Sequence, residues 1–194
     1  MRWMLLCIAL AGALPSVTFA HPGLGSTESF AAGVAHPFMG ADHVAATLAV
    51  GFWAALKGHR AVWAWPAIFV GMMFMGGAFG VAHLAVPYVN AGILASVIVV
   101  GLLVVFAVDL PLAAGAAIIG AFAFLHGHAH GSEVPETVNG VMYIAGLGLA
   151  TAALLGLGIE LALPARHVLS GFPIRLAGGA CIVVGVGLSC GVLA

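Results

Sequence analysis

The run AGILASVIVVGLLVVFAV at residues 91–108 carries no charged side chain and is long enough to enter a bilayer as a helix. Apolar runs of the same kind recur at about residues 29–56, 62–83, 112–126, 138–160 and 173–193. The fourth run is short unless the histidine-rich segment after residue 125 continues its helix. The sequence therefore predicts an all-α, polytopic membrane protein with a bundle of six transmembrane helices.

The composition agrees with lipid as the main solvent of this surface. Of the 194 residues, 63% are hydrophobic and 6% are charged, whereas a soluble domain carries about a quarter of its residues as charged side chains. The net charge of -1 leaves no basic face for nucleic acid, so the lipid bilayer is the expected surrounding. The 28 glycines are expected to let the helices approach closely.

Residues 1–20 have the pattern of a cleavable secretory signal peptide. Arg2 supplies the positive start, residues 5–14 form a short apolar run, and Thr18 and Ala20 are the small residues before the expected cleavage. We expect residues 21–194 to form a single transmembrane domain whose mature N-terminus is His21. An uncleaved membrane anchor is the alternative.

Charged residues predict the orientation independently of the signal peptide. Cleavage outside the membrane would place the connections after the first, third and fifth spans in the cytoplasm. The cations of the mature chain lie in or beside those connections, as the positive-inside rule requires: Lys57, Arg60, Arg166 and Arg175. Both signals place the N-terminus and most of the nine histidines on the outer side.

The segment HPFMGADH at residues 36–43 places His36, Asp42 and His43 inside the first apolar run. Ionisable groups are costly in hydrocarbon, so they are expected to face a partner, a cavity or an ion. On a straight helix the two histidines would stand about 10 Å apart along the axis. Pro37 and Gly40 permit a kink or an unwound turn that would bring them together. A polar packing cluster without an ion is the alternative.

A second segment, HGHAHGSE at residues 126–133, offers His126, His128, His130 and Glu133. An extended segment would align the three imidazoles on one side, whereas a helix would align only His126 with His130. Either arrangement offers a divalent cation several nitrogen donors and one carboxylate. The alternative is a solvated histidine-rich loop or a surface chelator of low affinity.

Two further histidines are weaker candidates for metal ligands. His83 stands at the outer end of the second predicted span, where a polar helix terminus is the commoner explanation. His21 would offer its ring and the freed α-amine, but Pro22 lacks the amide that a square-planar chelate recruits. Imidazole with carboxylate suits nickel, cobalt, copper or zinc, and these ligand types alone do not choose among the four.

The first histidine segment resembles the signature of the HupE/UreJ family of bacterial nickel permeases. The matching residues are His36, Pro37, Gly40, Asp42, His43, Gly51 and Trp53. The stretch FLHGHAHGSE at residues 124–133 is similar to the second histidine-rich motif of that family. Length, signal peptide and six spans also fit, so the resemblance covers essentially the whole chain. Related nickel/cobalt transporters have one fewer residue between the histidine and the Asp-His pair, which favours HupE/UreJ.

The resemblance implies uptake of nickel, or alternatively cobalt, across the bacterial inner membrane to supply nickel enzymes such as hydrogenase or urease. The ion is then cargo, so neither a permanently bound cofactor nor an enzymatic activity is expected. The sequence has no GxxxxGK motif, so transport would be facilitated diffusion or coupled to another gradient. The oligomeric state stays open.

The two segments are expected to divide the work of transport. We expect the second segment to collect the ion at the periplasmic mouth, through His126, His128, His130 and Glu133. We expect the first segment to form the intramembrane site, through His36, Asp42 and His43.

Two other classes of function deserve comparison. Paired histidines in a helical bundle can ligate haem, which would make the chain an electron-transfer protein. An intramembrane enzyme would use histidine and aspartate for acid-base chemistry or to hold a hydrolytic metal. The sequence contains no serine elbow and no HExxH motif, so the enzyme is the weaker of the two.

Overall fold

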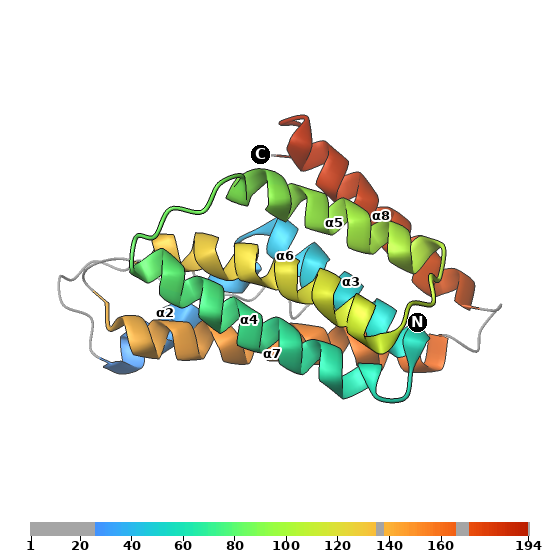
Figure 1. Cartoon of the computed structure of the whole chain (residues 1–194), viewed down its shortest axis with the longest axis horizontal. Coiled ribbons are helices and arrows are strands. Elements are labelled where there is room, and N and C mark those ends of the chain that lie inside the picture. The colour runs from blue at the N-terminus through green and yellow to red at the C-terminus, as the bar shows by residue number, and fades with distance from the viewer. Residues whose placement is uncertain (1–25, 135–137, 166–170, 194) are drawn as a thin grey trace, which may run out of the picture.

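The computed structural model describes residues 26–134, 138–165 and 171–193. These residues form helices joined by turns, with no strand among them, so the predicted all-α class is confirmed. The elements are α2 (Ser26–Ala35), η1 (His36–Phe38), α3 (Ala41–Lys57), α4 (Ala61–Val81), α5 (Val89–Val105), α6 (Leu112–Ser132), α7 (Gly140–Ala165) and α8 (Phe172–Ser189). Most of them run roughly along the long axis of the molecule (Figure 1). The predicted signal peptide and His21 lie outside the described residues.

Length and composition identify four or five candidate membrane spans among the described residues, compared with the six that the sequence predicts. Among the described residues, α4, α6, α7 and α8 are long and apolar enough to cross a membrane, and the bent pair of α2 with η1 and α3 makes a fifth span if it counts as one. The remaining apolar helix, α5, has 17 residues. At 1.5 Å per residue it is about 26 Å long, slightly less than the hydrocarbon core. The count of six therefore stays a prediction.

The histidine-rich segment continues the fourth predicted span as a regular helix. That span was expected at residues 112–126, but α6 extends to Ser132. Gly127 and Gly131 do not interrupt it, because they face α4: a Cβ on Gly127 would overlap the backbone of Met73, and one on Gly131 would overlap Gly77. The extended arrangement of the three histidines is therefore not present.

Glycines also let α7 pack against both arms of the bent pair. A Cβ on Gly33 of α2 would overlap the backbone of Tyr143 in α7, and one on Gly51 of α3 would come too close to Leu155 and Gly158. In lipid, small residues at helix interfaces favour association by allowing close backbone packing. The packing role expected for the glycines is confirmed at these contacts.

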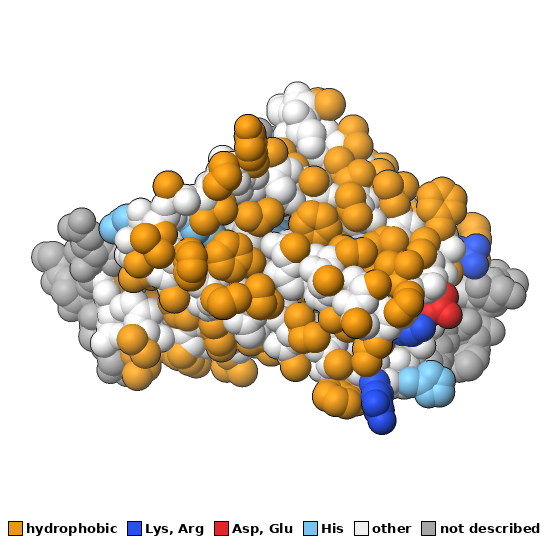
Figure 2. Space-filling model, viewed as in Figure 1, with side chains coloured by type: hydrophobic (Ala, Val, Ile, Leu, Met, Phe, Trp, Pro, Cys, Tyr) orange, Lys and Arg blue, Asp and Glu red, His pale blue; other side chains and the backbone are white. Residues whose placement is uncertain are grey.

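The surface and the two ends of the bundle differ in character. The face seen in Figure 2 is mostly hydrophobic, and large apolar side chains such as Trp63, Phe74 and Leu102 are exposed on the molecule, as lipid contact requires. The charged side chains visible there gather at one end (Figure 2). At that end Lys57 of α3 pairs with Asp109 in the α5–α6 connection.

We expect the close α4–α6 packing to be sensitive to a single methyl group. In Gly76→Ala the new Cβ would overlap the backbone of Phe124 on α6, which should destabilise the fold by about 1–3 kcal/mol. Gly71→Ala, on the same helix, is the matched control, because a Cβ there meets nothing within 4 Å. Unfolding of both purified variants in detergent micelles measures the difference. Equal stabilities would contradict the packing shown.

Candidate metal centre

A break at residues 36–40 divides the first apolar run into two arms. The axes of α2 with η1 and of α3 differ in direction by 78°. Pro37 lies in the first turn of η1, where its missing N–H is tolerated, and Gly40 is extended with φ -104° and ψ 117°. The break leaves His36 at the end of one arm and His43 in the first turn of the other. The kink expected at Pro37 and Gly40 is therefore present.

Both histidines of the break contact the same imidazole of α6. His130 Nδ1 lies 2.9 Å from His36 Nε2, and His130 Nε2 lies 2.9 Å from His43 Nδ1. The ring centroids are 4.8 Å and 4.7 Å apart in edge-to-face pairs. A straight helix would hold His36 and His43 too far apart for this arrangement. The break thus joins the two histidine segments of the sequence through His130.

The helical form of the second segment decides which of its histidines reach the cluster. His126 lies one turn before His130 on the same face of α6, because residues four apart align on a helix. Its ring centroid is 5.5 Å from that of His43, and both side chains are buried. His128 faces another direction, and its Nε2–H donates to the carbonyl of Leu84 at 2.8 Å.

The donors form two overlapping groups that share one histidine. We call His36, His130 and Glu133 the outer triad, and His43, His126 and His130 the inner triad. Within each triad, one ligand atom per residue lies within 4.8 Å of the other two. An ion with metal–nitrogen bonds of about 2.1 Å holds its donors between about 3 and 4 Å apart, so small side-chain movements would close either triad around it.

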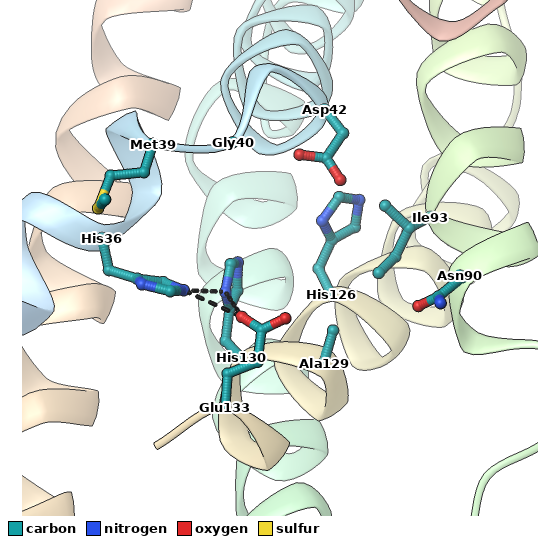
Figure 3. Close-up of a pocket in the computed structure, with 10 residues that line it drawn as sticks. All are labelled: His36, Met39, Gly40, Asp42, Asn90, Ile93, His126, Ala129, His130 and Glu133. Atoms are coloured by element: carbon teal, nitrogen blue, oxygen red, sulfur yellow. Dashed lines mark hydrogen bonds and ion pairs between the residues drawn. The ribbon is translucent and has the colours of Figure 1, made fainter. Parts of the chain in front are cut away.

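The exposure of the donor side chains decreases from the outer triad to the inner triad. A cavity of about 270 Å³ is lined by residues of both triads, and Glu133 is among the exposed residues that line it (Figure 3). The side chain of Glu133 is 60% exposed, that of His36 is 24% exposed and that of His130 is 12% exposed, whereas His43 and His126 are buried. The donors therefore form a continuous series from the exposed Glu133 into the bundle.

Glu133 and Asp42 supply the carboxylates of the cavity in different ways. Glu133 Oε2 lies 3.3 Å from His36 Nε2 and 3.9 Å from His130 Nδ1. Asp42 lines the cavity but belongs to neither triad, and its Oδ1 accepts a hydrogen bond from the backbone N–H of His43 at 2.8 Å. Asp42 thus also satisfies an N–H in the first turn of α3, which carries His43.

The other candidate residues lie away from the triads. His128 is hydrogen-bonded to the α4–α5 connection, and His83 is in that connection with a positive φ of 54°. Neither belongs to a donor group among the residues that the structure describes.

The structure also adds two buried hydroxyl groups that the sequence analysis did not identify: Ser96 lies 2.9 Å from His126 Nε2, and Thr151 lies 3.1 Å from His43 Nε2. In the sequence, each of these residues stands out only as an isolated hydroxyl side chain within an apolar helix.

The spacing of the histidine rings argues against the haem alternative. Two axial histidines would have to hold a planar macrocycle between their ligating nitrogens. Here the facing nitrogens of His43 and His130 hydrogen-bond to each other directly. The geometry favours a single ion over haem.

Comparison with known proteins gives a match over nearly the whole chain. Residues 8–188 match the family described as HupE / UreJ protein. The chain is 41% identical over 192 residues to Protein HupE of Rhizobium leguminosarum bv. viciae, which covers 98% of this chain and the full length of that protein. No solved structure shows a significant match.

Among the histidines that the structure describes, His130 should matter most for metal binding, because it belongs to both triads. We expect His130→Gln to weaken Ni²⁺ binding by more than about 100-fold, which exceeds the usual effect of a group that only orients a ligand. His128→Gln, two residues away on the same helix, should bind like the intact protein. Titration calorimetry of the purified chain in detergent measures both. The same affinity in the two variants would contradict the assignment.

Proposed function

The chain belongs to the HupE/UreJ family, and we propose that it is a permease of the bacterial inner membrane that imports Ni²⁺, or alternatively Co²⁺. The observation that carries the proposal is the series of donors from the exposed Glu133 through His130 to the buried His43. A series of this kind suits an ion that enters the bundle. Supply of nickel enzymes such as hydrogenase or urease is the proposed purpose.

The donor chemistry supports a late first-row divalent ion as the cargo. Imidazole nitrogen with one carboxylate suits Ni²⁺ and Co²⁺, whereas Mg²⁺ and Ca²⁺ prefer oxygen ligands. Cys181 and Cys190 are not members of either triad, so no thiolate favours Cu⁺ there. Three donors in each triad leave positions for water, which is consistent with binding that is reversible.

We infer that the ion passes from the outer triad to the inner triad by way of His130. A neutral imidazole has one lone pair and one N–H, so His130 can bind an ion through Nδ1 or through Nε2, but not through both. Its Nδ1 faces His36 and Glu133, and its Nε2 faces His43. Transfer inward would therefore move the ring proton from Nε2 to Nδ1. The shared ligand would also keep the two triads from being filled together.

The membrane potential is a sufficient driving force in this proposal. The predicted orientation places the outer triad at the periplasmic side, so an entering cation moves toward the negative interior. Each charge gains about 2.3 kcal/mol per 100 mV, and a divalent ion gains twice that amount. Neither ATP hydrolysis nor a coupled ion is required.

Substitutions in the two triads should affect different parameters of uptake. Glu133→Gln removes the exposed carboxylate that meets the ion first, so it should mainly raise the nickel concentration for half-maximal uptake. His43→Gln removes a buried donor of the inner triad, so it should lower the maximal rate at least about tenfold. Uptake of radiolabelled nickel by a host without its own importers measures both.

The control for that experiment is His83→Gln, which changes an exposed histidine outside the triads. All variants are compared at equal membrane levels. Normal uptake by His43→Gln would overturn the proposed route.

Uptake should also fall when the outside becomes acidic. Protonated imidazole has no lone pair for a metal, so acid is expected to lower uptake, and no rise is expected between pH 7.5 and pH 6. Import driven by protons would instead increase between pH 7.5 and pH 6. The initial rate of nickel uptake across this range, at constant membrane potential, separates the two mechanisms. A rise toward pH 6 would contradict the proposed downhill entry.

A further inference from the structure

Ser96 of α5 lies outside both triads, but its hydroxyl contacts a histidine of the inner triad. Ser96 Oγ is 2.6 Å from the carbonyl oxygen of Ile93 and 2.9 Å from His126 Nε2. Both side chains are buried, each with 1% of its residue surface exposed. The two contacts therefore persist without competition from bulk water.

The short contact to Ile93 fixes the direction of both hydrogen bonds. A carbonyl oxygen can only accept, so the single hydroxyl hydrogen of Ser96 lies between Oγ and the Ile93 carbonyl. The Ser96 oxygen has no second hydrogen to give to His126 and can only accept from it. His126 consequently carries its proton on Nε2.

That tautomer leaves the lone pair of His126 on Nδ1. In Figure 3 one ring nitrogen of His126 is turned toward His130 and the other toward α5, the helix that carries Ser96. Because Nε2 is the nitrogen bonded to Ser96, Nδ1 is the one that faces His130. A metal ion needs the lone pair on that side.

We propose that Ser96 is a positioning residue of the inner triad: it holds His126 as the Nε2–H tautomer and so presents the Nδ1 lone pair to Ni²⁺ or Co²⁺. The inference rests on the proposed function, because it concerns the same site. Groups that hydrogen-bond the far nitrogen of a metal-binding histidine fix its tautomer and ring orientation, and their loss usually lowers affinity about 10–100-fold.

Two other buried hydroxyl groups do not fix the tautomer of a triad histidine in the way that Ser96 does. The Thr151 hydroxyl contacts His43 Nε2, but its other neighbour is the sulfur of Met73 at 3.6 Å, too weak an acceptor to fix the hydrogen. The Thr47 hydroxyl donates to the carbonyl oxygens of His43 and Val44. Thr47 is equally buried and, like Ser96, bonds the backbone of its own helix, but both hydrogen bonds of its hydroxyl go to backbone carbonyls and not to a histidine ring. It is therefore a matched control.

The test uses binding of Ni²⁺ and Co²⁺ to the purified full-length protein in detergent, with calorimetry and the visible absorbance of bound Co²⁺ as readouts. Ser96→Ala should lower affinity about 10–100-fold and change the Co²⁺ spectrum as one nitrogen donor is lost. Thr47→Ala should bind like the intact protein. Ser96→Thr and Ser96→Val introduce side chains of nearly the same shape, but only threonine keeps the hydroxyl. Ser96→Thr should therefore retain metal affinity and Ser96→Val should lose it, even if both variants disturb packing.

A double-mutant cycle with His126→Ala separates positioning from general packing. If Ser96 acts through His126, Ser96→Ala should cause no further loss in the His126→Ala background. An equal loss in both backgrounds, or an unchanged affinity of Ser96→Ala, would overturn the proposal. A different result, in which the intact protein neither binds nor imports nickel, would instead overturn the proposed function.

Discussion

The break at residues 36–40 is the constraint on which the rest of the site depends. A continuous helix would keep His36 and His43 about two turns apart, and a single histidine of α6 would not meet both. Some of the polar backbone groups that the break frees are satisfied locally: Met39 N–H donates to the carbonyl of His36 and Val44 N–H to that of Gly40. The Asp42 carboxylate accepts from His43 N–H. These bonds lower the cost of the break in an apolar surrounding, where unpaired backbone groups are costly.

Close helix packing holds the two arms and α6 in place. α7 approaches both arms through glycines, and α6 approaches α4 in the same way. These contacts set the position of His126 and His130 relative to the break. Within the described part of the chain, every buried side-chain nitrogen and oxygen has a hydrogen-bond partner. Buried polar networks of this kind are rigid when they are fully paired, so the donors are oriented before any ion arrives.

The two ends of the bundle differ in a way that suits entry from one side. The donor residues line the cavity at the end of the bundle that carries the exposed Glu133. Toward the other end of α3, the rings of Trp53 and Trp65 lie 4.4 Å apart, and Lys57 pairs with Asp109. Trp53 and Trp65 also donate hydrogen bonds to the carbonyls of Val108 and Leu112, which ties this end to the α5–α6 connection. The histidine side thus holds the cavity lined by metal donors, whereas the other side holds paired tryptophans and an ion pair.

Features that depend on local composition and spacing could be predicted from the sequence. Uncharged apolar runs predicted membrane helices, and Pro37 with Gly40 predicted the kink. Histidine and aspartate are costly in apolar sequence, so their positions there identified the candidate donors. The grouping of those donors depends on the packing of the helices in three dimensions. The tertiary structure made the second segment helical, which removed His128 from the cluster, and it assigned His130 to both triads. It also brought Ser96 against His126, although 30 residues separate them in the chain. Periodicity determines which side chains share a helix face, but which faces meet depends on the close contacts between helices that are distant in the sequence.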